Sequence, residues 1–227
     1  MKEINTIQEL IHISEEQPSD DWVGGWFYRG QSIKEWELTP KAYRFPHINS
    51  NFESNYYSWE KQSCRLEKFD YENEFEGMAI AQHHGFPTKY LDWSSNILIA
   101  AFFACSEHLD QDGRLFAYFP THYITEPNER RLTDYDDIVA FQPRPISDRI
   151  QSQLGVFTFH PNEKNKIKNK FFTPARHYTL HDWIIPSDKK IFLLKSLDRL
   201  GINFKTIFPD LDGLSKHYCL MDEINIR

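Results

Sequence analysis

Apolar residues near the N-terminus recur at the spacing of a helix. Thr6 and Glu9 form a capping-box pattern in front of an apolar face, so we predict a short helix that ends before Pro18. The aromatic run over residues 22–28 is rich in strand-forming residues and stops at an Arg-Gly pair. That run predicts the first strand.

Helical periodicity returns between residues 51 and 84, a stretch that contains Gly77 and no proline. Apolar side chains at helical intervals predict two helices there, broken near Asp70. A polar loop with the sequence HHGFPTKY follows, and Ser95 or Asn96 is placed to cap a strongly apolar helix over residues 97–106. Because that helix is apolar on every side, we expect it to be buried almost all round.

Short aromatic and β-branched runs dominate after residue 113. The runs RLFAYF, DIVAF, VFTF, FFT and WIIP predict strands. A helix over residues 189–200, ended by Gly201 as a left-handed cap, and a last helix over residues 211–221 follow. A helix-rich N-terminal half before a strand-rich C-terminal half predicts an α+β fold. Because no repeat or linker separates the halves, we expect one domain over residues 1–227.

Composition and charge narrow the functional classes. Aromatic residues make up 15% of the 227 residues, which is enough apolar surface for a self-sufficient core. The formal net charge of −7 gives no bulk positive field toward phosphate backbones or anionic lipid, although a local basic groove is compatible with it. The cysteines, Cys64, Cys105 and Cys219, lack the spacing of a zinc site or a disulfide framework. Without a signal-like or membrane-spanning segment, we expect a soluble cytoplasmic protein.

Two segments place polar groups where the neighbouring pattern predicts burial. The first is FYRGQ, at residues 27–31. The Arg29 guanidinium offers a planar fork for a phosphate or carboxylate, and Gly30 lets another backbone or a ligand come close. The alternative is that Arg29 pairs with a structural carboxylate such as Asp92.

The second segment runs from Gln82 to Ser94 and holds Gln, two His, Thr, Asp, Trp and Ser between two apolar elements. Burying so many hydrogen-bonding groups is costly unless a network or a ligand satisfies them, so this segment predicts a site. The adjacent His83 and His84 cannot face the same way on a helix, and a third ligand position is missing. We therefore expect no metal here, and a core hydrogen-bonding histidine is the alternative.

Three further segments have simpler explanations. Residues 149–157 form a loop before a strand, with amide and guanidinium groups placed to line a pocket. The lysine-rich run at residues 163–170 is expected to be a solvated loop, with nucleic-acid contact as the alternative. The Asp-x-Asp-Gly at residues 210–213 lacks the other ligands of a calcium loop, so helix capping explains it.

Together these segments resemble the FRG domain, a family named for its aromatic-Arg-Gly motif. The resemblance rests on FYRGQ at 27–31, AQHHGFPTKYLDWSSNILIAAFFA at 81–104, RIQSQLGVF at 149–157 and KTIFPDLDG at 205–213. One departure is Lys89-Tyr90, where the family is expected to have Arg-Leu.

A remoter resemblance, to the ADP-ribosyltransferase superfamily, implies one ADP-ribosyltransferase-like domain with NAD as substrate. It implies that Arg29 binds the NAD phosphates, that Thr88 or Ser94 shapes the nicotinamide pocket, and that Gln151 or Gln153 takes the third position. That position is a Glu-x-Glu in the superfamily, so Gln-Ser-Gln means that either an amide serves or catalysis is lost. Glu223 is a reserve candidate.

These resemblances imply the following site. The expected catalytic residues are Arg29, Asp92 and Gln153, with Asp92 or Gln153 stabilising positive charge on the ribose. The expected NAD contacts are Tyr28, Arg29, Gly30, Gln31, Gln82, His83, His84, Thr88, Trp93 and Ser94.

The function that follows is an NAD-dependent ADP-ribosyltransferase-like effector of bacterial toxin or phage-defence type. Its acceptor would be a macromolecule, protein or nucleic acid, and its partners would include an antitoxin but no membrane. The alternatives are a non-catalytic module that senses a nucleotide or other ligand and a protein that acts on nucleic acid through the lysine-rich loop.

Overall fold

The chain forms a mixed α/β structure around one open sheet. The computed structural model describes residues 2–17, 25–45, 50–66, 71–125, 127, 131–167 and 180–226. The strands are β1 (Lys2–Glu3), β2 (Phe27–Gln31), β3 (Tyr90–Ser94), β4 (Gly113–Tyr118), β5 (Tyr123–Ile124), β6 (Val139–Phe141), β7 (Gly155–Phe159) and β8 (Leu180–Ile185). The helices are α1 (Ile7–Glu16), α2 (Lys41–Arg44), α4 (Phe52–Ser63), α5 (Glu74–His83), α6 (Ile97–Cys105), α7 (Asp148–Ser152), α8 (Ser187–Arg199), α9 (Phe204–Ile207) and α10 (Leu211–Ile226), with a 3₁₀ turn, η2 (Leu132–Asp134).

The strand order in the described sheet is β1-β8-β4-β2-β3-β7-β6-β5. Neighbours are antiparallel except for the outermost pairs, β1 with β8 and β5 with β6, which are parallel. The two strands at the centre, β2 and β3, come from the N-terminal half of the chain. The expected division into a helix-rich half and a strand-rich half is therefore corrected, because both halves contribute strands to one sheet.

The ladder between the two central strands is unusually short. β2 pairs with β4 at five positions, and β3 pairs with β7 at five, whereas β2 and β3 are matched only at Tyr28 and Ser94. Beyond that pair, Arg29 Nη1 donates to the backbone carbonyl of Asp92 at 2.5 Å. The guanidinium thus bridges two strands where their backbone ladder has stopped.

Most predicted helices are confirmed together with their capping residues. The Thr6 and Glu9 capping box begins α1, and α4 and α5 are the two helices expected between residues 51 and 84. Asn96, not Ser95, caps α6, because its Oδ1 accepts from Leu98 N at 2.8 Å. Gly201 follows α8 with φ of +81°, as a left-handed cap requires.

Several element boundaries differ from the expectation. The first strand is β1, and β2 extends through Gln31, so Arg29 and Gly30 lie within a strand. The segment expected to be a loop before β7 begins with the short helix α7. Local periodicity cannot reveal elements this short, because their conformation is fixed by the strands and helices beside them. Residues 22–24 of the first predicted strand and the FFT run at 171–173 lie outside the described residues.

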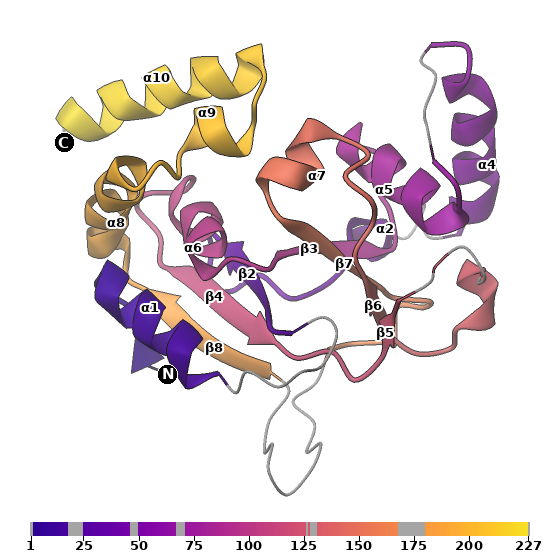
Figure 1. Cartoon of the computed structure of the whole chain (residues 1–227), viewed down its shortest axis with the longest axis horizontal. Coiled ribbons are helices and arrows are strands. Elements are labelled where there is room, and N and C mark those ends of the chain that lie inside the picture. The colour runs from indigo at the N-terminus through magenta and orange to yellow at the C-terminus, as the bar shows by residue number, and fades with distance from the viewer. Residues whose placement is uncertain are drawn as a thin grey trace, which may run out of the picture.

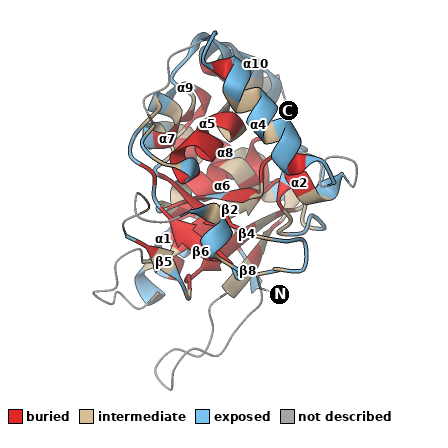
Figure 2. Ribbon diagram, turned by 90° about the vertical axis from the view of Figure 1, so that its right-hand side faces the viewer, coloured by how far each residue is buried: buried red, intermediate tan, exposed pale blue. Residues whose placement is uncertain are grey.

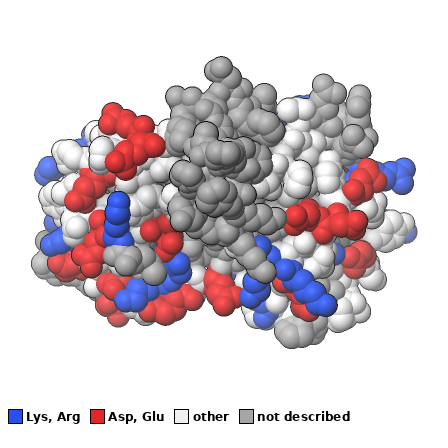
Figure 3. All heavy atoms as spheres, turned by 90° about the horizontal axis from the view of Figure 1, so that it is seen from below, with Lys and Arg blue, Asp and Glu red and all other residues white. Residues whose placement is uncertain are grey.

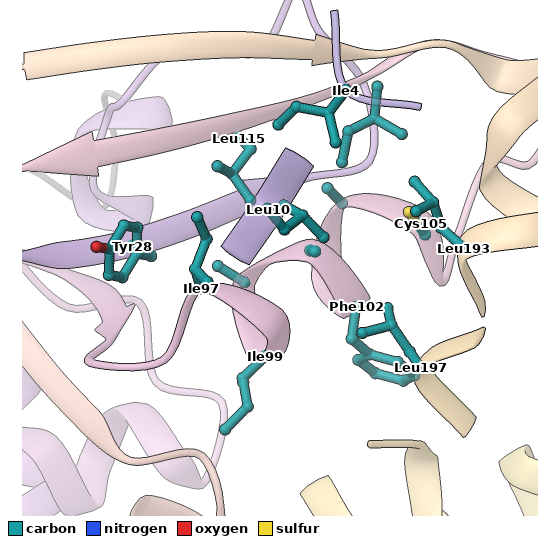
Figure 4. Close-up of a cluster of buried hydrophobic side chains, with 14 of the residues drawn as sticks. Ile4, Leu10, Tyr28, Ile97, Ile99, Phe102, Cys105, Leu115, Leu193 and Leu197 are labelled. Atoms are coloured by element: carbon teal, nitrogen blue, oxygen red, sulfur yellow. The ribbon is translucent and has the colours of Figure 1, made fainter. Parts of the chain in front are cut away.

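The main core lies between the sheet and the helices on one of its faces. The helices α5, α6, α8 and α10 lie on one side of the sheet (Figure 1). Buried residues are concentrated in the sheet and the helices directly over it, whereas α10 is largely exposed (Figure 2). α6 is buried nearly all round, as predicted, and its Phe102 and Ile97 lie among Leu115 of β4 and Leu193 of α8 (Figure 4). Among the described helices, none has the length and apolar character needed to cross a membrane.

Candidate functional site

A pocket of about 300 Å³ opens beside the point where β2 and β3 separate. Residues from β2, β3, α5, α6 and α7 converge on it, together with Phe208, which follows α9. We call it the Arg29 pocket, and it is lined by Tyr28, Arg29, Gly30, Ala79, Gln82, His83, Asp92, Trp93, Ser94, Ala100, Phe103, Arg149, Ile150, Gln153, Phe157 and Phe208. The expected proximity of the Arg29 strand to the segment ending at Ser94, with Gln153 alongside, is confirmed.

Arg29 is the most constrained cation in this pocket. Its side chain is 18% exposed, and besides the carbonyl of Asp92 its Nη1 lies 3.7 Å from Asp92 Oδ2. Burial lowers the pKa of Arg29 and the charge of Asp92 opposes that shift, while repulsion from Arg44 adds to it. The buried Nε has no hydrogen-bond partner among the described residues. Arg29 therefore has the structural pairing with Asp92 and also retains a donor for an anion.

The polar segment before β3 forms a hydrogen-bond network. Gln82 Nε2 donates to Asp92 Oδ1, and Thr88 Oγ1 donates to Gln82 Oε1. Thr88 Oγ1 also accepts from Tyr90 N at 3.2 Å. The chain Thr88–Gln82–Asp92–Arg29 thus links a loop, α5, β3 and β2, and it satisfies the buried groups that the sequence placed there.

Gln153 is held at the opposite wall by its neighbours. It is the C-cap of α7, its Nε2 donates to Ile207 O at 3.4 Å, and its backbone carbonyl accepts from Ser94 Oγ at 2.7 Å. Leu154, which follows it, has φ of +47° in the left-handed region. The Ser94 hydroxyl is therefore engaged in positioning α7, and the Gln153 amide lies at the cavity wall.

Arg149 supplies a second guanidinium to the pocket. Its Nη2 lies 2.9 Å from Asp210 Oδ2, and its guanidinium carbon lies 4.8 Å from the centre of the Phe208 ring. Asp210 Oδ1 also accepts from Gly213 N at 2.7 Å, which confirms the capping explanation for this segment. Arg149 Nε, like that of Arg29, is buried without a partner in the part of the chain that the structure describes.

Some of the expected contact residues lie elsewhere. Gln31 lies in a neighbouring hollow, Thr88 lines another, and His84 is exposed at the end of α5 and lines none of the hollows described here. Trp93 is among the residues that line the Arg29 pocket, but its ring packs on the other face of the sheet against Tyr118, with ring centres 5.4 Å apart. Strand alternation explains this placement, because Asp92 and Ser94 share one face of β3 and Trp93 takes the other.

Two smaller hollows meet the pocket at Arg29. The Trp36 hollow has a volume of about 190 Å³ and includes Gln31, Trp36, Arg44, Phe204 and Lys216. The Lys41 hollow includes Lys41, Arg44, Thr88 and Asp92. Elsewhere, on the face seen in Figure 3, the described basic and acidic side chains are interspersed. The three hollows that share Arg29 thus bring several basic side chains together, among them Arg44 and Lys216.

The departure from the FRG motif falls outside this pocket. Lys89 Nζ pairs with Glu53 Oε1 at 2.7 Å and lies 4.7 Å from the centre of the Phe52 ring. Tyr90 is buried and donates to Phe75 O at 3.2 Å. The Lys89-Tyr90 pair thus stabilises the packing of α4 and α5 and makes no contact with the pocket.

The lysine-rich run at residues 163–170 is described only in part. Its Lys166 pairs with Glu37 at 3.1 Å, and residues 168–170 lie outside the described part of the chain.

Sequence reasoning missed several residues of the site. Phe103 and Phe208 form apolar walls, and Trp36, Arg44 and Lys216 come from segments without any local signal. Arg149 was recognised only as part of a polar loop. The strongest available signal was the KTIFPDLDG segment, which contains Phe208. Across the described residues, no group of three His, Cys, Asp or Glu side chains is placed to hold a metal ion.

Comparison with known families agrees with part of this picture. Residues 24–113 match the FRG domain. The FRG match covers β2, β3, α5 and α6, and therefore Arg29 and the Gln82–Asp92 network, and it ends at the start of β4. The segments at 149–157 and 205–213, which complete the pocket wall, lie beyond it. Neither the curated proteins nor the solved structures gave a match to the chain.

A buried network behind the pocket makes a prediction about pH. Trp93 Nε1 donates to Thr158 Oγ1 at 2.9 Å, Thr158 Oγ1 contacts His160 Nε2 at 3.1 Å, and His160 Nδ1 contacts Asn165 O at 2.9 Å. Burial lowers the pKa of His160 from 6.5 to about 4. Because the carbonyl requires an N–H donor, Nδ1 carries the proton and Nε2 accepts.

We expect this histidine to make the protein less stable in acid. Between pH 6.5 and 4 the unfolded chain binds a proton that the folded chain does not, so the free energy of unfolding falls as pH drops through this window. The loss attributable to His160 should be on the order of 3 kcal/mol. Urea unfolding of the wild type and His160→Gln at a series of pH values measures it. An equal pH dependence in the variant would contradict the prediction.

Proposed function

We propose that the Arg29 pocket binds NAD and that the protein transfers its ADP-ribose unit to a macromolecule. The observation that supports this most strongly is that two guanidiniums, Arg29 and Arg149, line one cavity, and each has a buried Nε without a partner among the described residues. A buried donor without an acceptor is costly, so an anionic oxygen supplied by a ligand is the natural complement. The aromatic walls provided by Tyr28, Phe103 and Phe208 suit the rings of a nucleotide.

Each group then has a defined part in the reaction. Arg29 holds the pyrophosphate, and the Gln82–Asp92 pair lies beside the ribose next to nicotinamide. The bond between ribose C1′ and the nicotinamide nitrogen breaks, and its electron pair leaves with nicotinamide. The acceptor nucleophile forms a new bond to C1′ and releases its proton. Positive charge on the ribose during this step is stabilised by the Asp92 carboxylate and the Gln153 carbonyl oxygen.

The exposure of Asp92 and the burial of Tyr28 are consistent with these roles in the reaction. Asp92 is 56% exposed at its side chain, so it stays accessible to a ligand while bonded to Arg29 and Gln82. Burial raises the pKa of Tyr28 to about 12, which keeps its phenol neutral and able to donate a hydrogen bond. The acceptor, protein or nucleic acid, would approach from the open side of the pocket, and an antitoxin or immunity protein would act by covering that side.

A second candidate function, ligand sensing without catalysis, is favoured by one observation. Among the described residues that line the pocket, Asp92 is the one carboxylate, and it already accepts from Gln82 Nε2 and lies 3.7 Å from Arg29 Nη1. In this version the pocket binds NAD or ADP-ribose and leaves it intact. The two functions differ in whether nicotinamide is released.

Incubation of the purified protein with labelled NAD and a cell lysate tests the proposal. Transfer of label to protein or to nucleic acid, with release of nicotinamide, is expected. Arg29→Lys keeps the charge but loses the planar fork, so NAD binding should weaken at least about tenfold while the folded structure survives.

Arg114→Lys is the matched control. Arg114 also lies on a strand, pairs with Asp182 at 2.7 Å and is outside the pocket, so its variant should bind NAD normally. Binding of NAD without nicotinamide release would favour the sensing function. Loss of thermal stability in Arg29→Lys with unchanged NAD affinity would overturn the proposed role of Arg29.

A further inference from the structure

We infer that the Trp36 hollow is a second subsite, which binds the purine nucleoside end of a dinucleotide whose pyrophosphate lies at Arg29. This inference rests on the proposed function, because it assigns the part of NAD that the Arg29 pocket leaves unplaced. Two hollows, of about 300 and 190 Å³, share Arg29, Gly30, Phe103 and Phe208 as common walls. A ligand with two ring systems joined through a central pyrophosphate has that same division.

The first support is an aromatic surface available for stacking. The side chain of Trp36 is 42% exposed and lines the hollow, and it contacts the His108 ring edge-on at 5.6 Å. An exposed indole in the wall of a hollow offers a flat apolar face on which a ring of a ligand can stack. Purine rings stack on such indoles, and the stacking is worth a large part of the binding free energy.

The second support is an unsatisfied acceptor at the wall of the hollow. Gln31 is only 4% exposed, and its Nε2 donates to Glu37 O at 3.3 Å. Its Oε1 has no hydrogen-bond partner among the described residues. A buried carbonyl oxygen without a donor is costly, and the exocyclic amino group of a purine or a ribose hydroxyl supplies one.

The third support is the charge at the junction of the two hollows. Arg44 lies close enough to Arg29 to lower its pKa by repulsion, and Lys216 Nζ lies 5.9 Å from the centres of the Phe204 and Phe208 rings. Glu107 is the one acidic side chain among the lining residues of the hollow. Several cations held together in a protein with a net charge of −7 favour a polyanionic group such as a pyrophosphate.

Calorimetric titration with three probes tests the subsite: NAD, ADP and nicotinamide mononucleotide. Trp36→Ala should raise the Kd of NAD and of ADP about tenfold, because a stacking surface for one base is lost. The Kd of nicotinamide mononucleotide should stay unchanged, since it lacks the purine end. Trp36→Phe should restore most of the affinity. Phe192→Ala, which removes another exposed aromatic ring outside both hollows, should have no effect.

The outcomes separate this inference from the proposed reaction. ADP and NAD binding that depends on Trp36, without nicotinamide release, supports the subsite and contradicts the transferase. Nicotinamide release with unchanged NAD affinity in Trp36→Ala contradicts the subsite alone. Failure of the wild type to bind ADP, or equal weakening of all three probes in the variant, also overturns it.

Discussion

Gly30→Ala is expected to lower the free energy of unfolding by at least about 3 kcal/mol, because the added carbon has no room. A Cβ built on Gly30 would lie 1.8 Å from Ala100 O and 2.5 Å from Ala104 N, which are backbone atoms of α6. A helix backbone cannot move aside as a flexible side chain can, so β2 and α6 would have to separate. For a chain of this size the melting temperature should fall by roughly 6–12 °C.

Gly155→Ala is the matched control, since Gly155 also lies in a strand that is paired on both sides within the sheet. Its added Cβ would lie 3.3 Å from Ile150 O, a contact that a small shift relieves. We expect that variant to lose no more than about 1 kcal/mol. Calorimetry measures the melting temperature of both variants. A Gly30→Ala protein as stable as the wild type would contradict the close packing of β2 against α6. The close approach of the α6 backbone thus explains the glycine of this motif.

Gln153→Ala is expected to slow nicotinamide release about a hundredfold or more, if the proposed reaction is right. The Gln153 amide lies at the cavity wall and is held by its bond to Ile207 O, so a contact to the ribose would be preorganised. An amide cannot act as a general base, so Gln153 itself should add no dependence of the rate on pH near the pKa of ordinary carboxylates.

Two variants serve as controls for Gln153. Gln151→Ala removes an identical amide two residues earlier, from an exposed position in α7 outside the pocket, and should leave the rate unchanged. Glu223→Gln should be nearly silent, because Glu223 is exposed on α10 and does not line the pocket. Steady-state release of labelled nicotinamide compares all three. A dead Glu223→Gln enzyme beside an active Gln153→Ala enzyme would mean that the third position of the superfamily lies on α10.

The polar residues of the site were recognisable because they violate the surrounding pattern. Gln82, Thr88 and Asp92 lie within or next to strongly apolar elements, and a buried polar group such as Thr88 persists there only when something bonds it. Their mutual hydrogen bonds are the network that the pattern predicted. The same reasoning failed for His84, which lines none of the hollows, and it did not reveal that the Trp93 ring packs on the other face of the sheet, because a run of polar and aromatic residues does not say where each side chain points.

The aromatic and basic walls were not recognisable in this way. Phe208 and Lys216 lie more than a hundred residues from Arg29 in sequence, yet they line hollows that include it. The local sequence around Phe208 or Lys216 would look the same if these residues were ordinary packing or solvent-exposed residues. Only long-range packing, which brings α9 and α10 against the end of β2, gives these side chains a common neighbour.

The sequence by itself determined the periodic helices, the runs that become β4, β6 and β7, the caps at Thr6 and Gly201, and the two segments that carry the pocket's polar groups. These features depend on contacts within a few residues, so local spacing is enough to specify them. The tertiary structure alone decided that β2 and β3 lie at the centre of the sheet and pair only at Tyr28 and Ser94. Strand order and register are set by which surfaces bury each other across the whole chain, and that burial leaves the Arg29 guanidinium between two separating strands.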